Sequence, residues 1–268
     1  MNDQEKFKSL YIFTGKGGVG KTTTSLAFCH YLISQNKPCT YVTLEEIIKN
    51  DIDFSSFEHL NFELWESVNL YLEKKFSSKV VAALILKAPF FRALIKMMPG
   101  FRYVIFMGHL INKMKSNPEH IYVMDSPSSG HLLTLFESLY HFKDMFGTGS
   151  IASDLQDSLD YWVTNKPYKI NIIAGPQKTI LQETLELKEV LLRNFELESE
   201  VYVNFSLTKI KNIEVGDNNP NFLTEKIENE KKCLTEYKDY IQGLIPYSPK
   251  LKHELQINEL TPNTEQCI

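Results

Sequence analysis

The sequence predicts an α/β fold with a doubly wound, mostly parallel sheet and an inserted helical subdomain. Three observations support this prediction. Short apolar runs typical of buried strands alternate with helical patterns along the 268 residues. A glycine-rich segment joins the first strand to the first helix, and a long apolar helical stretch separates the early strands from the later ones. We therefore expect one domain over residues 1–268, with the helical subdomain at residues 53–115.

The expected elements follow in a regular order. Apolar and β-branched runs predict strands at 10–13, 39–43, 121–125, 170–174, 200–205 and 243–246. Helical spacing of apolar residues is found at 22–34, 77–115, 132–142, 179–194 and 222–241. The segments 147–150 and 211–221 contain glycine or are polar, so we expect loops there.

Composition narrows the functional classes. The chain is 43% hydrophobic, enough for a large core, and its net charge of −4 does not favour nucleic-acid binding. No run is long enough to span a membrane, and residues 1–9 lack a signal-type apolar stretch, so we expect a cytoplasmic protein. Cys29, Cys39, Cys233 and Cys267 form no C-x-x-C pair, which favours free thiols over a metal site.

Residues 15–22 are Gly-Lys-Gly-Gly-Val-Gly-Lys-Thr and fit the phosphate-loop pattern G-x-x-x-x-G-K-[ST]. Glycines let backbone N–H groups curl around a phosphate. Lys21 would reach the β- and γ-phosphates, and the Thr22 hydroxyl would bind Mg²⁺. A strand precedes the loop and a helix follows it, as the motif requires. We therefore expect a nucleoside triphosphatase of the phosphate-loop type.

Two carboxylates are candidates for the remaining chemistry. Asp125 ends an apolar strand and would hold the water shell of Mg²⁺, although an aspartate after a strand is also a common turn residue. Glu45 follows the second strand and would orient the attacking water; the alternative is that Glu45 and Glu46 open a solvated helical turn. Gly130, in the segment after Asp125, would let a backbone N–H approach the γ-phosphate.

Lys16 is a second lysine within the loop. The ordinary phosphate loop needs only the lysine at the position of Lys21. An added cation beside a triphosphate suits charge stabilisation across a subunit interface, the role of an arginine finger. Lys16 thus indicates a site shared by two subunits.

Four segments, in order, resemble the arsenical-pump and tail-anchored-protein-targeting ATPase family. The loop with Lys16 resembles that family's deviant phosphate loop, which cell-division-site, plasmid-partition and nitrogenase-iron-protein ATPases share. Residues 125–131 (Asp-Ser-Pro-Ser-Ser-Gly-His) resemble its D-T-A-P-T-G-H segment, and Met98-Pro99-Gly100 resembles the P-G before it. Residues 175–184 are similar to its P-E-(x5)-E-T stretch, and Asn204 stands in register with the asparagine of V-V-N.

The resemblance implies roles for individual residues in a dimeric, Mg²⁺-dependent ATPase. Lys16 would contact the nucleotide of the partner subunit. Thr22 would bind the metal directly, and Asp125 would act through its water shell. Asn204 would recognise adenine, and Pro246 would pack on the base. The implied nucleotide-binding residues are Gly15, Lys16, Gly17, Gly18, Val19, Gly20, Lys21, Thr22, Thr23, Gln177, Asn204 and Pro246.

Departures from the family pattern bear on activity. The family's D-P-A after the second strand is Glu45-Glu46-Ile47 here, so the water-positioning Asp becomes a longer Glu. The Glu of P-E is replaced by Gln177, which removes one charge. The zinc-binding C-x-x-C and the arsenite-binding cysteines are absent from the sequence, so neither a zinc-clasped dimer nor arsenite activation is expected. ATP binding is therefore better supported than ATP hydrolysis.

The helical subdomain carries the client site in this family. Its Met and Phe content suits an adaptable apolar groove for a hydrophobic protein client, and ordinary core packing is the alternative. Lys74, Lys75, Lys79 and Lys87 flank this stretch and would face anionic lipid or simply water.

The sequence thus predicts a homodimeric ATPase whose closure on ATP is coupled to binding of a hydrophobic client or a membrane-associated partner. No nucleic-acid partner is expected. Three alternatives stay open: a nucleotide-gated binding module with weak or no hydrolysis, a positioning or partition regulator, and a heterodimer with a paralogue.

Overall fold

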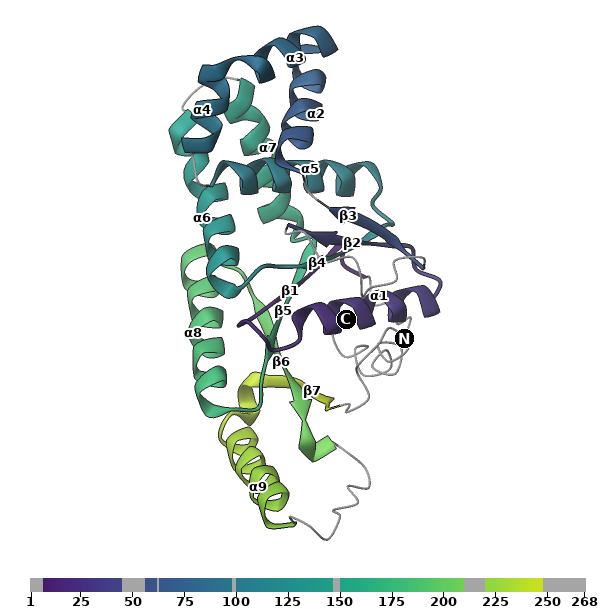
Figure 1. Cartoon of the computed structure of the whole chain (residues 1–268), viewed down its shortest axis with the longest axis vertical. Helices are drawn as coiled ribbons and strands as arrows, with labels where there is room; N and C mark the ends of the chain where they lie inside the picture. Colours follow the sequence, from purple (N-terminus) through teal and green to yellow (C-terminus); the bar gives the residue numbers. More distant parts are fainter. Residues whose placement is uncertain are drawn as a thin grey trace.

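A parallel sheet forms the centre of the molecule (Figure 1). The computed structural model describes residues 7–44, 56–61, 63–97, 100–146, 150–209 and 220–247. Within these ranges the sheet has seven strands, and all six neighbouring pairs run parallel. In spatial order they are β3 (Glu58–Asn61), β2 (Cys39–Thr43), β4 (Ile121–Asp125), β1 (Leu10–Thr14), β5 (Tyr168–Ala174), β6 (Ser199–Ser206) and β7 (Ile241–Pro246). The predicted doubly wound α/β fold is confirmed, with a described sheet that is wholly rather than mostly parallel.

Alternation along β1 explains why helices cover both faces of the sheet. Successive side chains of a strand point to opposite faces. Leu10 and Ile12 pack in the core under α5 (Phe101–Ser116), α6 (Ser129–Phe146), α7 (Ser150–Asn165) and α8 (Lys178–Phe195). Tyr11 and Phe13 pack on the other face, against α1 (Lys21–Ser34). The central strands β2, β4, β1, β5 and β6 are therefore buried on both faces for most of their length, whereas the edge strands β3 and β7 are partly exposed.

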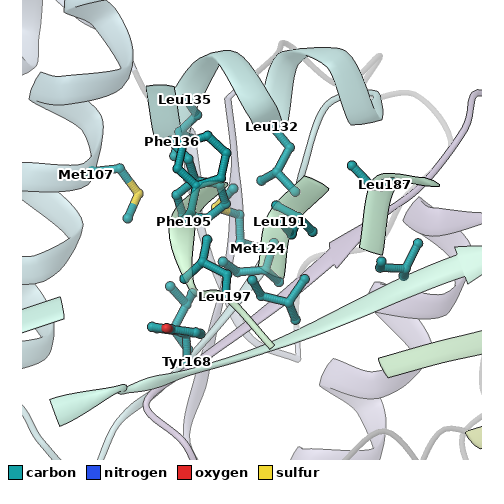
Figure 2. Close-up of a cluster of buried hydrophobic side chains, with 14 of the residues drawn as sticks. Met107, Met124, Leu132, Leu135, Phe136, Tyr168, Leu187, Leu191, Phe195 and Leu197 are labelled. Carbon is teal, nitrogen blue, oxygen red and sulfur yellow. The ribbon is translucent and has the colours of Figure 1, made fainter. Parts of the chain in front are cut away.

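The larger core brings together residues that are far apart in the sequence. Figure 2 shows Met107 of α5, Phe136 of α6 and Phe195 of α8 gathered over Met124 and Tyr168 of the sheet. Burying one such side chain stabilises the fold by about 1.5–3 kcal/mol. These contacts fix the helices of this face against the strands whose carboxyl ends carry the candidate site.

A third, smaller core lies in the helical subdomain, which Figure 1 places beyond the β3 edge of the sheet. It joins α2 (Leu64–Phe76), α3 (Lys79–Lys87) and α4 (Pro89–Met97) through Val68, Leu72, Ala82 and Ile95. The Ser78 hydroxyl caps α3 by accepting a hydrogen bond from the Val81 amide at 3.3 Å. The predicted helical stretch at 77–115 is thus confirmed but broken into separate helices.

Several element bounds differ from the sequence prediction. β3 joins the sheet although it falls inside the range expected for the subdomain, and α2 begins well before residue 77. α6 begins at Ser129, so Gly130 lies in its first turn rather than in a loop. The helix α7 was not predicted from the sequence, although Leu155, Leu159 and Trp162 recur there at helical spacing.

The bounds near the end of the described chain also differ. α9 (Pro220–Glu236) is shorter than the helix expected at 222–241, and Ile241 begins β7 instead of ending that helix. A single apolar residue fits both periodicities, so the pattern could not separate them. The expected loops at 147–150 and 211–221 lie almost wholly outside the described residues.

Candidate functional site

The candidate site lies where β1 meets α1, at the carboxyl edge of the sheet. β1 sits between β4 and β5, and the chain crosses from one half of the sheet to the other between those strands. Ligands of open α/β sheets bind at the carboxyl ends of strands beside such a crossing. The sequence places the phosphate loop, residues 15–20, in this position.

At two positions of the loop, a neighbouring atom lies so close to the backbone that only glycine fits. Gly15 has φ of +143°, and a Cβ there would lie 2.1 Å from the Ile173 carbonyl oxygen of β5. Gly20 has φ of +87°, and a Cβ there would lie 2.3 Å from Asn204 Nδ2. Neither contact allows a side chain. The two glycines therefore let the loop pass closely over the ends of β5 and β6.

The rest of the loop and the first turn of α1 contain no acidic residue. Lys16, Gly17 and Gly18 are exposed, whereas Val19 is buried and anchors the loop in the core. Gly20 caps α1 without a side-chain hydrogen bond. Backbone N–H groups at such a helix N-terminus favour a phosphate.

The two loop lysines have different partners. Lys21 Nζ donates to the Lys16 carbonyl oxygen at 3.1 Å, so its ammonium is folded back over the loop. Lys16 Nζ lies 2.7 Å from both carboxylate oxygens of Glu183 on α8. The sequence motif identified both lysines, but it gave no sign that Glu183 of the same chain holds Lys16.

Thr22, Asp125 and Tyr41 form a polar cluster beneath the loop. Thr22 Oγ1 donates to Asp125 Oδ2 at 2.6 Å, and Tyr41 Oη donates to the same oxygen at 3.0 Å. Burial, reinforced by the Asp125 charge, raises the pKa of Tyr41 well above its usual value, so Tyr41 stays protonated and remains a donor. Hydroxyl and carboxylate oxygens are the protein ligands that Mg²⁺ prefers, so Thr22 and Asp125 fit the predicted metal.

The segment after Asp125 connects this cluster to the helical subdomain. The Ser126 amide donates to the Phe13 carbonyl oxygen at 3.0 Å, which ties the segment to β1. α6 then begins at Ser129, with Gly130 in its first turn. His131 Nδ1 lies 3.0 Å from the hydroxyl of Tyr103 on α5. His131 thus joins the start of α6 to α5.

Asn204 packs against the phosphate loop from the end of β6. Its Nδ2 donates to the Val19 carbonyl oxygen at 3.0 Å, and its Oδ1 accepts from the Phe205 amide at 2.9 Å. Asn204 is buried, and Phe205 has a positive φ of 62°, uncommon for an aromatic residue. The structure thus brings Asn204 to the loop, where its side chain hydrogen-bonds to the loop backbone at Val19.

The other residues expected on the base side lie near the same edge. Pro246 ends β7 and pairs in register with Ser206 of β6. Gln177 is exposed at the start of α8 and makes no side-chain cap. Glu230 of α9 accepts hydrogen bonds from Ser206 Oγ at 2.7 Å and from the Leu207 amide at 3.2 Å, a link that the sequence did not predict. This buried carboxylate fixes the chain just after Asn204.

Two predicted features lie outside the described residues. Glu45 and Glu46 follow Leu44, the last described residue after β2, so the position of the candidate water-positioning carboxylate is not described. Met98 and Pro99 of the proline–glycine segment are likewise outside the described ranges.

Neither the known protein families nor the curated proteins include a match to this chain. Every helix in the described ranges is too short or too polar to cross a lipid bilayer. The same residues include no group of three or more His, Cys, Asp or Glu side chains able to hold a metal by themselves. A phosphate-bound Mg²⁺ needs only one or two protein ligands, so this finding leaves Thr22 and Asp125 as candidates. Cys29, Cys39 and Cys233 are free and buried.

Proposed function

We propose that this protein is a Mg²⁺-dependent, ATP-binding and ATP-hydrolysing dimer of the arsenical-pump and tail-anchored-protein-targeting type, located in the cytoplasm. Closure of the dimer on ATP would be coupled to binding of a hydrophobic client or a membrane-associated partner. One observation carries the proposal: a glycine loop with Lys21 lies over a 2.6 Å contact between Thr22 and Asp125. These residues supply the donors and the metal ligands that a nucleoside triphosphate requires.

The decisive experiment measures binding and turnover on the full chain. We expect ATP to bind in the presence of Mg²⁺, and we expect steady-state release of inorganic phosphate. Mg²⁺, when bound, would neutralise charge on the phosphates during transfer. If neither ATP nor ADP binds at millimolar concentrations with Mg²⁺, the proposal is wrong.

A nucleotide-gated binding module with little hydrolysis is the second candidate. Gln177 favours it, because this exposed side chain is neutral where the resembling family has a glutamate. Glu45 in place of the shorter Asp favours it as well. Tight, Mg²⁺-dependent ATP binding without phosphate release would select this candidate over the ATPase.

The Lys16–Glu183 ion pair supports a site completed by a second subunit. Lys16 stands beside the loop, yet its ammonium is held by Glu183 of the same chain. About half of each side chain is exposed, so the pair is weak and the lysine can exchange partners. In a closed dimer, the phosphates bound by the partner subunit would replace the Glu183 carboxylate.

Lys16→Ala is expected to spare ATP binding but to lower ATP-driven dimer formation and turnover by about tenfold or more, because a charge-stabilising cation is lost. Glu183→Gln is expected to act in the opposite direction and to lower the ATP concentration needed for dimerisation by up to about fivefold. Light scattering across an ATP titration measures dimer formation by both variants, and release of inorganic phosphate measures turnover.

The control for Glu183→Gln is Glu236→Gln. Glu236 of α9 forms an exposed ion pair, at 2.6 Å, with Lys178. Lys178 lies on α8, the helix that also carries Glu183. This variant should leave dimerisation unchanged. Equal dimerisation by Lys16→Ala, Glu183→Gln and the unaltered chain would contradict the shared-site hypothesis.

The outer face of α3 and α4 supports a hydrophobic client. Val80, Leu84, Phe90 and Met97 are 71%, 65%, 80% and 79% exposed. Exposed apolar side chains gathered in this way are typical of a binding surface. A separate cavity of about 1120 Å³ lies between α2, α4, α5 and α7, with Val68, Ile95 and Ile105 in its wall. Buried packing at Val68 and Ile95 and exposed apolar side chains on α3 and α4 thus occur in the same subdomain.

Leu84→Glu with Phe90→Glu is expected to abolish capture of an apolar helical peptide, because two charges would have to be buried in the complex. ATP binding should not change, since α3 and α4 lie well apart from α1, whose N-terminus follows the phosphate loop (Figure 1). Fluorescence anisotropy of a labelled apolar peptide, with ATP and with ADP, measures capture. Unaltered capture by the double variant would exclude this face as the client site.

A further inference from the structure

Tyr41 occupies a position that the phosphate-loop motif does not explain. It lies on β2, whose register pairs it with Val123 of β4 and pairs Thr43 with Asp125. The side chain is fully buried and reaches along β4 to the Asp125 carboxylate, where its hydroxyl donates at 3.0 Å. Phenylalanine would fill the same space, so packing alone does not require the hydroxyl.

The Tyr41 hydroxyl and the Thr22 hydroxyl converge on one oxygen. Both donate to Asp125 Oδ2, from β2 and from α1 respectively. Ser25 Oγ lies 3.5 Å from Tyr41 Oη and 3.0 Å from the Thr22 carbonyl oxygen, which links the two donors through α1. Three elements thus fix the position and rotation of this carboxylate.

We propose that Tyr41 is a positioning residue that orients the Asp125 carboxylate for Mg²⁺ binding. The inference rests on the proposed function, because it assumes that Thr22 and Asp125 hold the metal of a bound nucleotide. A Thr22 hydroxyl that turns its oxygen towards a metal still needs an acceptor for its proton, and Asp125 Oδ2 is that acceptor. Tyr41 keeps this oxygen in place, because its own hydroxyl donates to it from a different element, β2.

The test is the Mg²⁺ requirement of nucleotide binding by Tyr41→Phe in the full chain. We expect the Mg²⁺ concentration for half-maximal ADP binding to rise roughly tenfold, the size of one hydrogen bond to a charged group. The affinity for ADP in EDTA should stay within about twofold of the unaltered chain, because the loop donors are untouched. An unchanged Mg²⁺ requirement would overturn the inference. An equal loss of affinity with and without Mg²⁺ would also overturn it, since a merely structural role predicts that result.

Tyr202→Phe is the matched control. Tyr202 is also buried in a parallel strand, and its hydroxyl donates to a carboxylate, that of Glu200, away from the loop. Its Mg²⁺ requirement should equal that of the unaltered chain. If Tyr41→Phe does not fold, p-aminophenylalanine at position 41 replaces the hydroxyl with a weaker donor. A rise in the Mg²⁺ requirement that is smaller than tenfold then supports the proposal, and no rise overturns it.

The experiment separates failure of the inference from failure of the proposed function. If the unaltered chain binds no nucleotide at any Mg²⁺ concentration, the proposed function is wrong and the inference falls with it. If the unaltered chain binds ADP more tightly with Mg²⁺ but Tyr41→Phe behaves identically, only the role of Tyr41 is wrong.

Discussion

Lys21→Ala is expected to lower the affinity for ATP about 100-fold or more and to remove measurable turnover. The Lys21 ammonium is folded over the loop, 3.1 Å from the Lys16 carbonyl oxygen, and no large movement is needed for it to reach a phosphate in the loop. A charged hydrogen bond lost from a partly desolvated site is worth roughly 3 kcal/mol, which sets the expected factor. Isothermal titration with ATP and Mg²⁺, together with phosphate release, measures both effects.

Lys37→Ala is the control for this prediction. Lys37 is an exposed lysine just after α1, at the end of the helix opposite the phosphate loop. Removing it changes the net charge equally but touches no part of the site. Both variants should unfold at nearly the same temperature as the unaltered chain. ATP binding that survives in Lys21→Ala would refute the assignment of the loop.

Gly15→Ala is expected to destabilise the fold by about 3 kcal/mol and to abolish nucleotide binding. The new Cβ would lie 2.1 Å from the Ile173 carbonyl oxygen, in a backbone conformation with φ of +143°. Backbone atoms cannot move aside as a flexible side chain can, so the loop or β5 must shift. A loss of about 3 kcal/mol corresponds to a fall of roughly 6–12 °C in the melting temperature for a domain of this size.

Gly17→Ala isolates the steric cause. A Cβ at Gly17 would meet no atom within 4 Å, so this variant should melt within about 2 °C of the unaltered chain. Differential scanning calorimetry of the two alanine variants gives the comparison. Equal melting temperatures for Gly15→Ala and Gly17→Ala would show that the close approach to Ile173 does not constrain the loop.

Much of the architecture could be predicted because its signals are local. Residues 10–22 contain a buried strand, a glycine loop and a helix start in direct succession, and each is specified by neighbouring residues. The apolar strands at 121–125 and 170–174 were found with their observed carboxyl ends. Asp125 could therefore be placed at the correct edge of the sheet before its contacts were known.

Other features could not be predicted for identifiable reasons. β3 is only four residues long and partly exposed, so its alternation is too short to recognise. The exposure of Leu84 and Phe90 depends on whether another surface covers them. An apolar helix face has the same sequence pattern whether it is covered by another surface or exposed to water.

The sequence by itself determined where the loop lies and the parallel α/β class, because glycine positions, lysines and strand patterns act through adjacent residues. Only the tertiary structure decided which groups meet there. Tyr41 and Asp125 are 84 residues apart, Lys16 and Glu183 are 167 apart, and Val19 and Asn204 are 185 apart. Such contacts depend on strand order and register, which a two-residue period does not encode. The tertiary structure therefore places the loop next to Asp125, which Tyr41 holds by a hydrogen bond, and next to Glu183, which pairs with Lys16.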